Sequence, residues 1–161
     1  MLAIPSPLIT QMQDHARACY PDEGCGLLFG IAEAAGLRAT RCVPLDNLAN
    51  RLHAMDPVEY PRTARDAFSV NEAKMGRLVR EAEAAGERWL AFFHSHIDCG
   101  AYFSAEDRKY AAPDGVPVYP GLLQIVIDCQ PDRIVEAKSF SWDGADFALV
   151  QSYPEFARSG R

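Results

Sequence analysis

The spacing of hydrophobic residues predicts a mixture of helices and short buried strands. In residues 7–20, apolar side chains recur every three or four positions, which is the period of an amphipathic helix. Residues 25–31 form a short apolar run with glycines, as in a buried strand, and residues 37–45 alternate loosely after a turn at 34–36. We therefore expect a helix followed by a β-hairpin in this part of the chain.

The middle of the chain carries one strong helical pattern and two weaker patterns. Residues 71–85 are rich in Ala, Glu, Lys and Arg and are followed by Gly86, which predicts a helix that ends there. Residues 46–55 predict a loop followed by an edge strand. Residues 57–69 predict a helix with Asp56 as its cap, because a proline is well placed at the first helical position.

Three further apolar runs predict core strands, at residues 89–94, 122–128 and 134–142. A helix is expected to begin at Ser104, and a last strand or helix follows near the C-terminal end. Because strands and helices are mixed without strict alternation, the pattern favours an α+β fold, a central mixed sheet flanked by helices, over a doubly wound sheet. No linker divides the chain, so we expect a single domain spanning residues 1–161.

Composition and charge narrow the class of protein. The 161 residues are 48% hydrophobic and 24% charged, which is ordinary for a soluble globular protein, and the formal net charge of -6 argues against nucleic-acid and anionic-membrane partners. Signal-peptide features and membrane-length apolar runs are lacking. The chain has five cysteines, an odd number, so we expect reduced thiols and a cytoplasmic location. No two of them form a C-x-x-C pair, so we do not expect a four-cysteine zinc site.

One stretch of the sequence carries residues suited to metal chemistry. His94 and His96 lie two apart at the end of a predicted strand, so their side chains share a face and can bind one ion. Asp107, in the first turn of the next predicted helix, can add a carboxylate. Two histidines and one aspartate leave a fourth tetrahedral position open for water, as in catalytic zinc sites.

The same stretch also has a structural interpretation. Ser104 and Asp107 have the spacing of a helix capping box, with Ser104 as the N-cap residue. An isolated H-x-H on a strand is a weak signal, and on the sequence alone we do not expect Asp107 to serve fully both as cap and as metal ligand. Cys99 is a less favoured spare ligand, and Ser95, on the opposite strand face, is assigned a structural role.

The combined spacing resembles the JAMM, or MPN-plus, metalloprotease motif, in which a distant glutamate precedes H-x-H, ten residues with a serine near their end, and an aspartate. Glu23, in Pro-Asp-Glu-Gly-Cys-Gly-Leu-Leu, matches the distant glutamate. Ile97 and Phe103 stand where the family, or many of its bacterial members, have proline. The resemblance covers about residues 7–142 and implies a JAB/MPN fold with the layered architecture of cytidine deaminases, although the P-C-x-x-C segment of deaminases is absent.

This resemblance also implies an activity. It implies a Zn²⁺-dependent hydrolase that cleaves the peptide or isopeptide bond after the C-terminal glycine of a ubiquitin-like, β-grasp protein. His94, His96 and Asp107 would bind the metal, Glu23 would act as general base, and Ser104 would help to stabilise the oxyanion. Bacterial conjugation operons, including antiphage defence, are the favoured setting. Release of cysteine from a sulfur-carrier protein and a non-catalytic MPN scaffold remain as alternatives.

Overall fold

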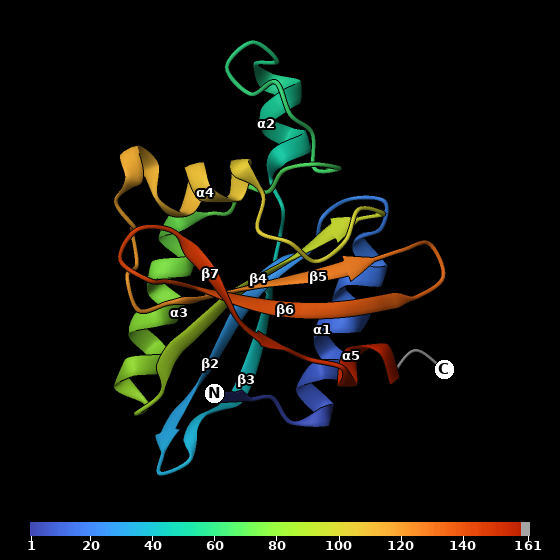
Figure 1. Cartoon of the computed structure of the whole chain (residues 1–161). Helices are drawn as coiled ribbons and strands as arrows, with labels where there is room; N and C mark the ends of the chain where they lie inside the picture. Colours follow the sequence, from blue (N-terminus) through green and yellow to red (C-terminus); the bar gives the residue numbers. More distant parts are fainter. Residues whose placement is uncertain (159–161) are drawn as a thin grey trace.

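The structure, a computed structural model that describes residues 1–158, is built around one mixed seven-stranded sheet (Figure 1). Its strand order is β1-β3-β2-β4-β5-β6-β7. The strands are β1 (Leu2–Ala3), β2 (Cys25–Glu33), β3 (Gly36–Leu45), β4 (Arg88–Ile97), β5 (Leu123–Cys129), β6 (Ile134–Trp142) and β7 (Phe147–Ser152). The helices are α1 (Ser6–Cys19), α2 (Ala49–Met55), α3 (Glu72–Ala84), α4 (Ala105–Ala111), the 3-10 turn η1 (Pro113–Gly115) and α5 (Glu155–Arg158).

Strand β4 is the centre of the sheet. It pairs antiparallel with β2 and parallel with β5, while β2 pairs with β3, and β5, β6 and β7 follow one another antiparallel. The parallel step from β4 to β5 requires the chain to cross over one face of the sheet, and this connection contains α4. The end of β4 is therefore covered by the helix that follows it in sequence.

The sheet separates two helical layers. Helices α1 and α5 pack on one face, where Met12 and Phe156 are fully buried against β-strand side chains such as Phe93. Helix α3 packs on the other face through Met75, next to Phe92. Successive residues of β4 thus face opposite layers, as the two-residue period of a strand requires. The observed architecture confirms the predicted α+β fold with a central sheet flanked by helices.

The segment between β3 and α3 differs from the sequence-based prediction. The edge strand expected in residues 46–55 is wrong, because residues 49–55 form α2, which Asn47 initiates by accepting a hydrogen bond from Ala49 N at 3.1 Å. The helix expected over residues 57–69 is also wrong. Asp56 does accept hydrogen bonds from the next backbone amides, but Pro61 supplies no amide hydrogen and the chain continues through turns.

Helix α2 and the turns after it project from the body of the molecule, at the top of Figure 1. The segment returns to the sheet just before α3, where Val70 is buried in the core. Within residues 1–158, no helix has both the length and the apolar character needed to cross a membrane.

Candidate metal centre

The two histidines lie side by side at the C-terminal end of β4. Both point to the face of the sheet that carries α3 and α4, and both are buried, His94 completely and His96 with 4% of its surface exposed. Their ring centroids are 5.0 Å apart. The strand period therefore places two imidazoles on one side of the sheet, as the sequence predicted.

Helix α4 brings Asp107 over these histidines. Asp107 Oδ1 is 3.1 Å from His94 Nε2, and Oδ2 is 3.2 Å from His96 Nε2. The capping box is also present: Ser104 Oγ accepts from Asp107 N at 3.0 Å, and Asp107 Oδ2 accepts from Ser104 N at 2.8 Å. The expectation that Asp107 would not fill both roles is wrong in geometry, because its two oxygens reach the helix end and both rings at once.

The geometry of the three side chains fits a metal ion. Both ring nitrogens of His94 are buried without a hydrogen-bond partner among the described residues, although Nε2 faces the carboxylate. Ligands about 2.0–2.1 Å from a tetrahedral zinc lie about 3.3 Å from one another, close to the separations of 3.1 and 3.2 Å found here. Ligand atoms of all three residues lie within 4.8 Å of one another. Two ring nitrogens that face the two oxygens of one carboxylate are placed as ligands of a shared cation would be.

Hydrogen bonding prepares His96 to be a ligand. His96 Nδ1 lies 3.0 Å from Gly100 O, and because a carbonyl only accepts, Nδ1 carries the proton. The lone pair of Nε2 is then directed at Asp107. Such a partner on the far nitrogen is typical of metal-binding histidines.

The charges of His94 and Asp107 are those that metal binding requires. Burial lowers the pKa of His94, and the neighbouring Asp107 only partly opposes this. Burial raises the pKa of Asp107, but the close His94 and His96 rings and the hydrogen bond from the Ser104 amide outweigh it and leave the pKa below its usual range. A neutral imidazole and an ionised carboxylate are the forms that coordinate metals.

Glu23 reaches the same site through the pairing of β2 with β4. Cys25 pairs with His94, and Ser95 continues the pairing by donating from its amide to Gly24 O and by accepting from Gly24 N through Oγ, each at 2.8 Å. One residue further, this register places Glu23 beside His96. Ser95 thus has the structural role that the sequence indicated.

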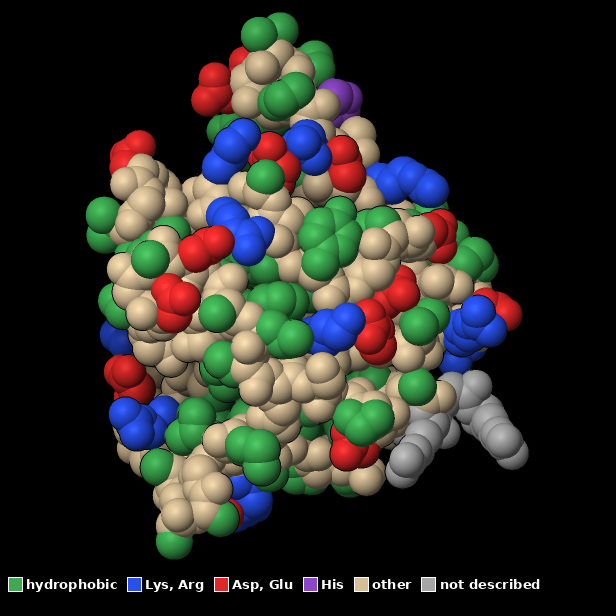
Figure 2. Space-filling view, in the orientation of Figure 1, with side chains coloured by type: hydrophobic (Ala, Val, Ile, Leu, Met, Phe, Trp, Pro, Cys, Tyr) green, Lys and Arg blue, Asp and Glu red, His purple; other side chains and the backbone are tan. Residues whose placement is uncertain are grey.

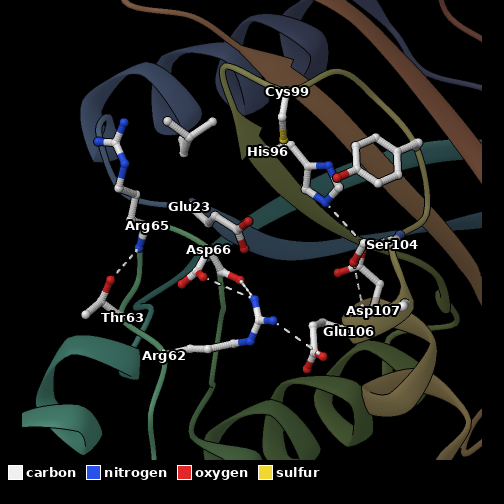
Figure 3. Close-up of a pocket in the computed structure, with 13 residues that line it drawn as sticks. Glu23, Arg62, Thr63, Arg65, Asp66, His96, Cys99, Ser104, Glu106 and Asp107 are labelled. Carbon is white, nitrogen blue, oxygen red and sulfur yellow. Dashed lines mark hydrogen bonds and ion pairs between the residues drawn. The ribbon is translucent and has the colours of Figure 1, made fainter. Parts of the chain in front are cut away.

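The carboxylate of Glu23 faces the cavity beside Asp107 (Figure 3). Glu23 is 6% exposed, and no side-chain hydrogen bond to it occurs within residues 1–158. Burial, followed by the negative charges of Asp107 and Asp66, raises the pKa of Glu23 to about 9. A buried carboxyl with a raised pKa in a cavity is a frequent property of catalytic acids and bases.

The cavity above these residues has a volume of about 610 Å³. Its rim includes Arg62, which contacts Asp66 at 3.1 Å and Glu106 at 3.5 Å and so joins the projecting segment to α4. Figure 2 shows basic and acidic side chains interspersed on the surface below the projecting segment. The mouth of the site is therefore polar and carries both charges.

The two departures from the family motif are accommodated locally. Ile97 is buried and pairs with Cys129, so it extends β4 by one residue. Phe103 packs against Phe140 and Phe147, with ring centroids 5.6 and 4.6 Å away, and anchors the loop before Ser104. Cys99 lines the cavity but is not in the group whose ligand atoms converge.

The sequence analysis missed three residues that shape the site. Phe68 lies against His94 with ring centroids 4.7 Å apart, Tyr102 lies 4.9 Å from His96, and Asn47 binds the backbone of Glu23. Phe68 was hidden because its segment was predicted to be helical. Asn47 accepts from Ala49 N two residues on, a turn that asparagine commonly forms, so its local role could have been found from the sequence.

Comparison with known proteins places these features in a family. Residues 5–143 match the family described as prokaryotic homologs of the JAB domain. The chain is 28% identical over 140 residues to a desampylase of Haloferax volcanii, which covers 87% of this chain and 84% of that protein. It is 32% identical over 115 residues to a CysO-cysteine peptidase of Mycobacterium tuberculosis, covering 71% and 68%.

Solved structures show the same fold. The solution structure of a protein from Desulfitobacterium hafniense superimposes with a TM-score of 0.66 and 26% identity, covering 100% of this chain and 99% of that one. A solution structure from Salinibacter ruber has a TM-score of 0.59 and 20% identity, covering 92% and 88%.

Proposed function

This chain belongs to the family of prokaryotic JAB-domain homologs, which makes it a JAB-family hydrolase of the JAMM type, and we propose that it is a zinc-dependent peptidase or isopeptidase acting on a ubiquitin-like protein. The bond cleaved follows the C-terminal glycine of that protein. The observation that carries the proposal is the convergence of His94, His96 and Asp107, together with a Glu23 carboxylate in the cavity that His96 and Asp107 also line.

In the proposed hydrolysis, the metal ligands, Glu23 and Ser104 each have a separate role. His94, His96 and Asp107 would hold a zinc ion, which would supply Lewis-acid activation of water and of the substrate carbonyl. The positive charge of the ion would lower the pKa of Glu23 from its raised value, so that the ionised carboxylate accepts the proton of the attacking water. Glu23 then returns this proton to the leaving nitrogen, so the peptide C–N bond breaks and a free amine leaves. Ser104 Oγ accepts from Asp107 N and keeps its own proton to donate to the developing oxyanion.

A substrate tail cannot add as a strand to β4, because β4 is paired on both sides, with β2 and β5. The open space lies instead between the segment of residues 62–66 and the start of α4, which together line the cavity. A tail that enters there passes close to buried backbone, and glycine allows the closest approach.

Release of cysteine from a sulfur-carrier protein is the second candidate function. The names of the relatives, a desampylase and a CysO-cysteine peptidase, correspond to these two alternatives. Both reactions use the same metal, base and oxyanion donor, and they differ in the group that leaves. The scaffold alternative is disfavoured because all the proposed catalytic and metal-binding side chains are present, and all of them except the fully buried His94 line one cavity.

The test uses purified, zinc-loaded protein and a β-grasp modifier fused through its terminal glycine to a second protein. We expect one cut after that glycine, read from product masses, and no cut when a valine replaces it. Efficient cleavage of the valine fusion, or scattered cuts, would indicate a general peptidase. Absence of cleavage of every fusion, with zinc bound and the fold intact, would favour the scaffold.

A further inference from the structure

The side-chain amide of Asn47 is fully used in binding backbone. Nδ2 donates to Glu23 O and to Ala67 O, each at 2.9 Å. Oδ1 accepts from Ala49 N and from Ser69 N, each at 3.1 Å. An asparagine amide has two donor hydrogens and two acceptor lone pairs, so all four are satisfied by three separate parts of the chain.

Asn47 holds the backbone of Glu23 in place, whereas the Glu23 side chain has no hydrogen bond within residues 1–158. The Glu23 carbonyl accepts from Asn47, and the Glu23 amide donates to Ala64 O at 2.7 Å. The carboxylate itself makes no hydrogen bond within the described part of the chain, 1–158. Its position is therefore set by these two main-chain anchors and by the register of β2.

The same amide also fixes an aromatic ring against a proposed metal ligand. Asn47 binds Ala67 O and Ser69 N, the residues on either side of Phe68. The Phe68 ring lies 4.7 Å from the His94 ring, at an interplanar angle of 38°. The Asn47 side chain therefore positions both the backbone of Glu23, the proposed base, and the Phe68 ring that packs on His94, a proposed ligand.

We propose that Asn47 is a positioning residue that holds the Glu23 carboxylate at its working distance from the metal centre; this rests on the function proposed above. A misplacement of about 1 Å can cost roughly 10²-fold in rate. Asn47→Ala and Asn47→Asp should therefore lower kcat about 10- to 100-fold, with KM and zinc content within about two- to threefold of the parent protein, because substrate contacts and metal ligands are unchanged.

The two variants separate the donors from the acceptors. Aspartate keeps the oxygens that accept from Ala49 and Ser69 but removes the donors to Glu23 and Ala67. We expect Asn47→Asp to lower kcat while the Ser69 amide stays protected from hydrogen exchange, and Asn47→Ala to expose Ser69 as well. Asn71→Ala is the matched control, since Asn71 caps α3 by accepting from Lys74 N at 2.9 Å and has no bond to Glu23. It should lower the melting temperature and leave kcat unchanged.

Hydrogen exchange of the metal-free full chain provides the readout that does not need turnover. Peptides that contain residues 22–25 should exchange faster in both Asn47 variants than in the parent and in Asn71→Ala. Unchanged exchange there, or a kcat within threefold of the parent in Asn47→Asp, would overturn the proposal, as would an equal loss of kcat in Asn71→Ala. If Asn47→Ala does not fold, Asn47→Asp alone decides. A parent protein without any turnover refutes the proposed function, and the exchange data still test the positioning.

Discussion

The ionisable carboxyl of Glu23 should destabilise the metal-free protein at neutral pH, because the group must take up a proton when the chain folds. The carboxyl is 6% exposed, lies near Asp107 and Asp66, and has a pKa raised to about 9. In the unfolded chain the same group ionises near its usual pKa of about 4.3. Glu23→Gln keeps the shape and removes the ionisable group, so we expect it to stabilise the metal-free protein at pH 7.

The sign and size follow from proton linkage. Between pH about 4.5 and 9 the folded protein holds a proton on Glu23 that the unfolded chain has lost, so stability falls as the pH rises through this window. At pH 7 the pH lies about 2.5 units above the pKa of Glu23 in the unfolded chain. At 1.36 kcal/mol per unit, the group therefore lowers the free energy of unfolding by at most roughly 3 kcal/mol. Since 1 kcal/mol shifts the melting temperature of a domain this size by about 2–4 °C, Glu23→Gln should raise it by up to roughly 10 °C.

The assay is thermal unfolding of chelator-treated protein at pH 4.5 and pH 7. The gain from Glu23→Gln should be present at pH 7 and small, about 0.6 kcal/mol, at pH 4.5, where the unfolded parent is still roughly 40% protonated at this position. Glu59→Gln, at an exposed glutamate, is the control and should change neither value. No gain at pH 7, or an equal gain at both pH values, would refute the reasoning.

Three further predictions concern the metal and the catalytic groups. Protein purified without chelator should contain about one zinc per chain by elemental analysis, and His96→Ala should lose most of it; full zinc in a His94→Ala plus His96→Ala double variant would disprove the site. Glu23→Ala should keep its zinc and lose roughly 10²- to 10⁴-fold in turnover of a modifier fusion, the usual contribution of a general base; loss of the metal instead would make Glu23 a ligand. Ser104→Ala removes both a helix cap and an oxyanion donor, so its melting curve should show about 1 kcal/mol of lost stability and its kcat should fall by about 10²- to 10³-fold, whereas an unchanged kcat would leave Ser104 with the cap alone.

The parts of the site that could be predicted depend on local geometry. His94 and His96 share a strand face because of the strand period, and Ser104 and Asp107 approach each other because a helix begins between them. Glu23 is different. Its place beside His96 depends on the register of two strands nearly seventy residues apart, and only the resemblance to a known motif indicated it.

The parts that could not be predicted depend on contacts between distant residues. The segment after α2 lacks regular structure, and its course is set by bonds such as Asn47 to Ala67 and Ser69 and by Phe68 packing on His94. None of these pairs leaves a periodic pattern in the sequence. Asp56 accepts hydrogen bonds from the amides that follow it, as a capping residue does, but the sequence did not show that a loop and not a helix comes next.

The three proposed ligands differ in their hydrogen bonds to the rest of the chain, and this difference helps to decide which related sequences still bind a metal. Asp107 caps the start of α4 through its bond to Ser104, and His96 is bound to Gly100, so both would still contribute to folding in a chain that no longer held a metal. His94 has no hydrogen-bond partner within residues 1–158, and an apolar side chain would suit its buried place better. A histidine at position 94 is therefore the most informative sign that a related chain is an active hydrolase, and an aspartate at position 107 is a weaker one.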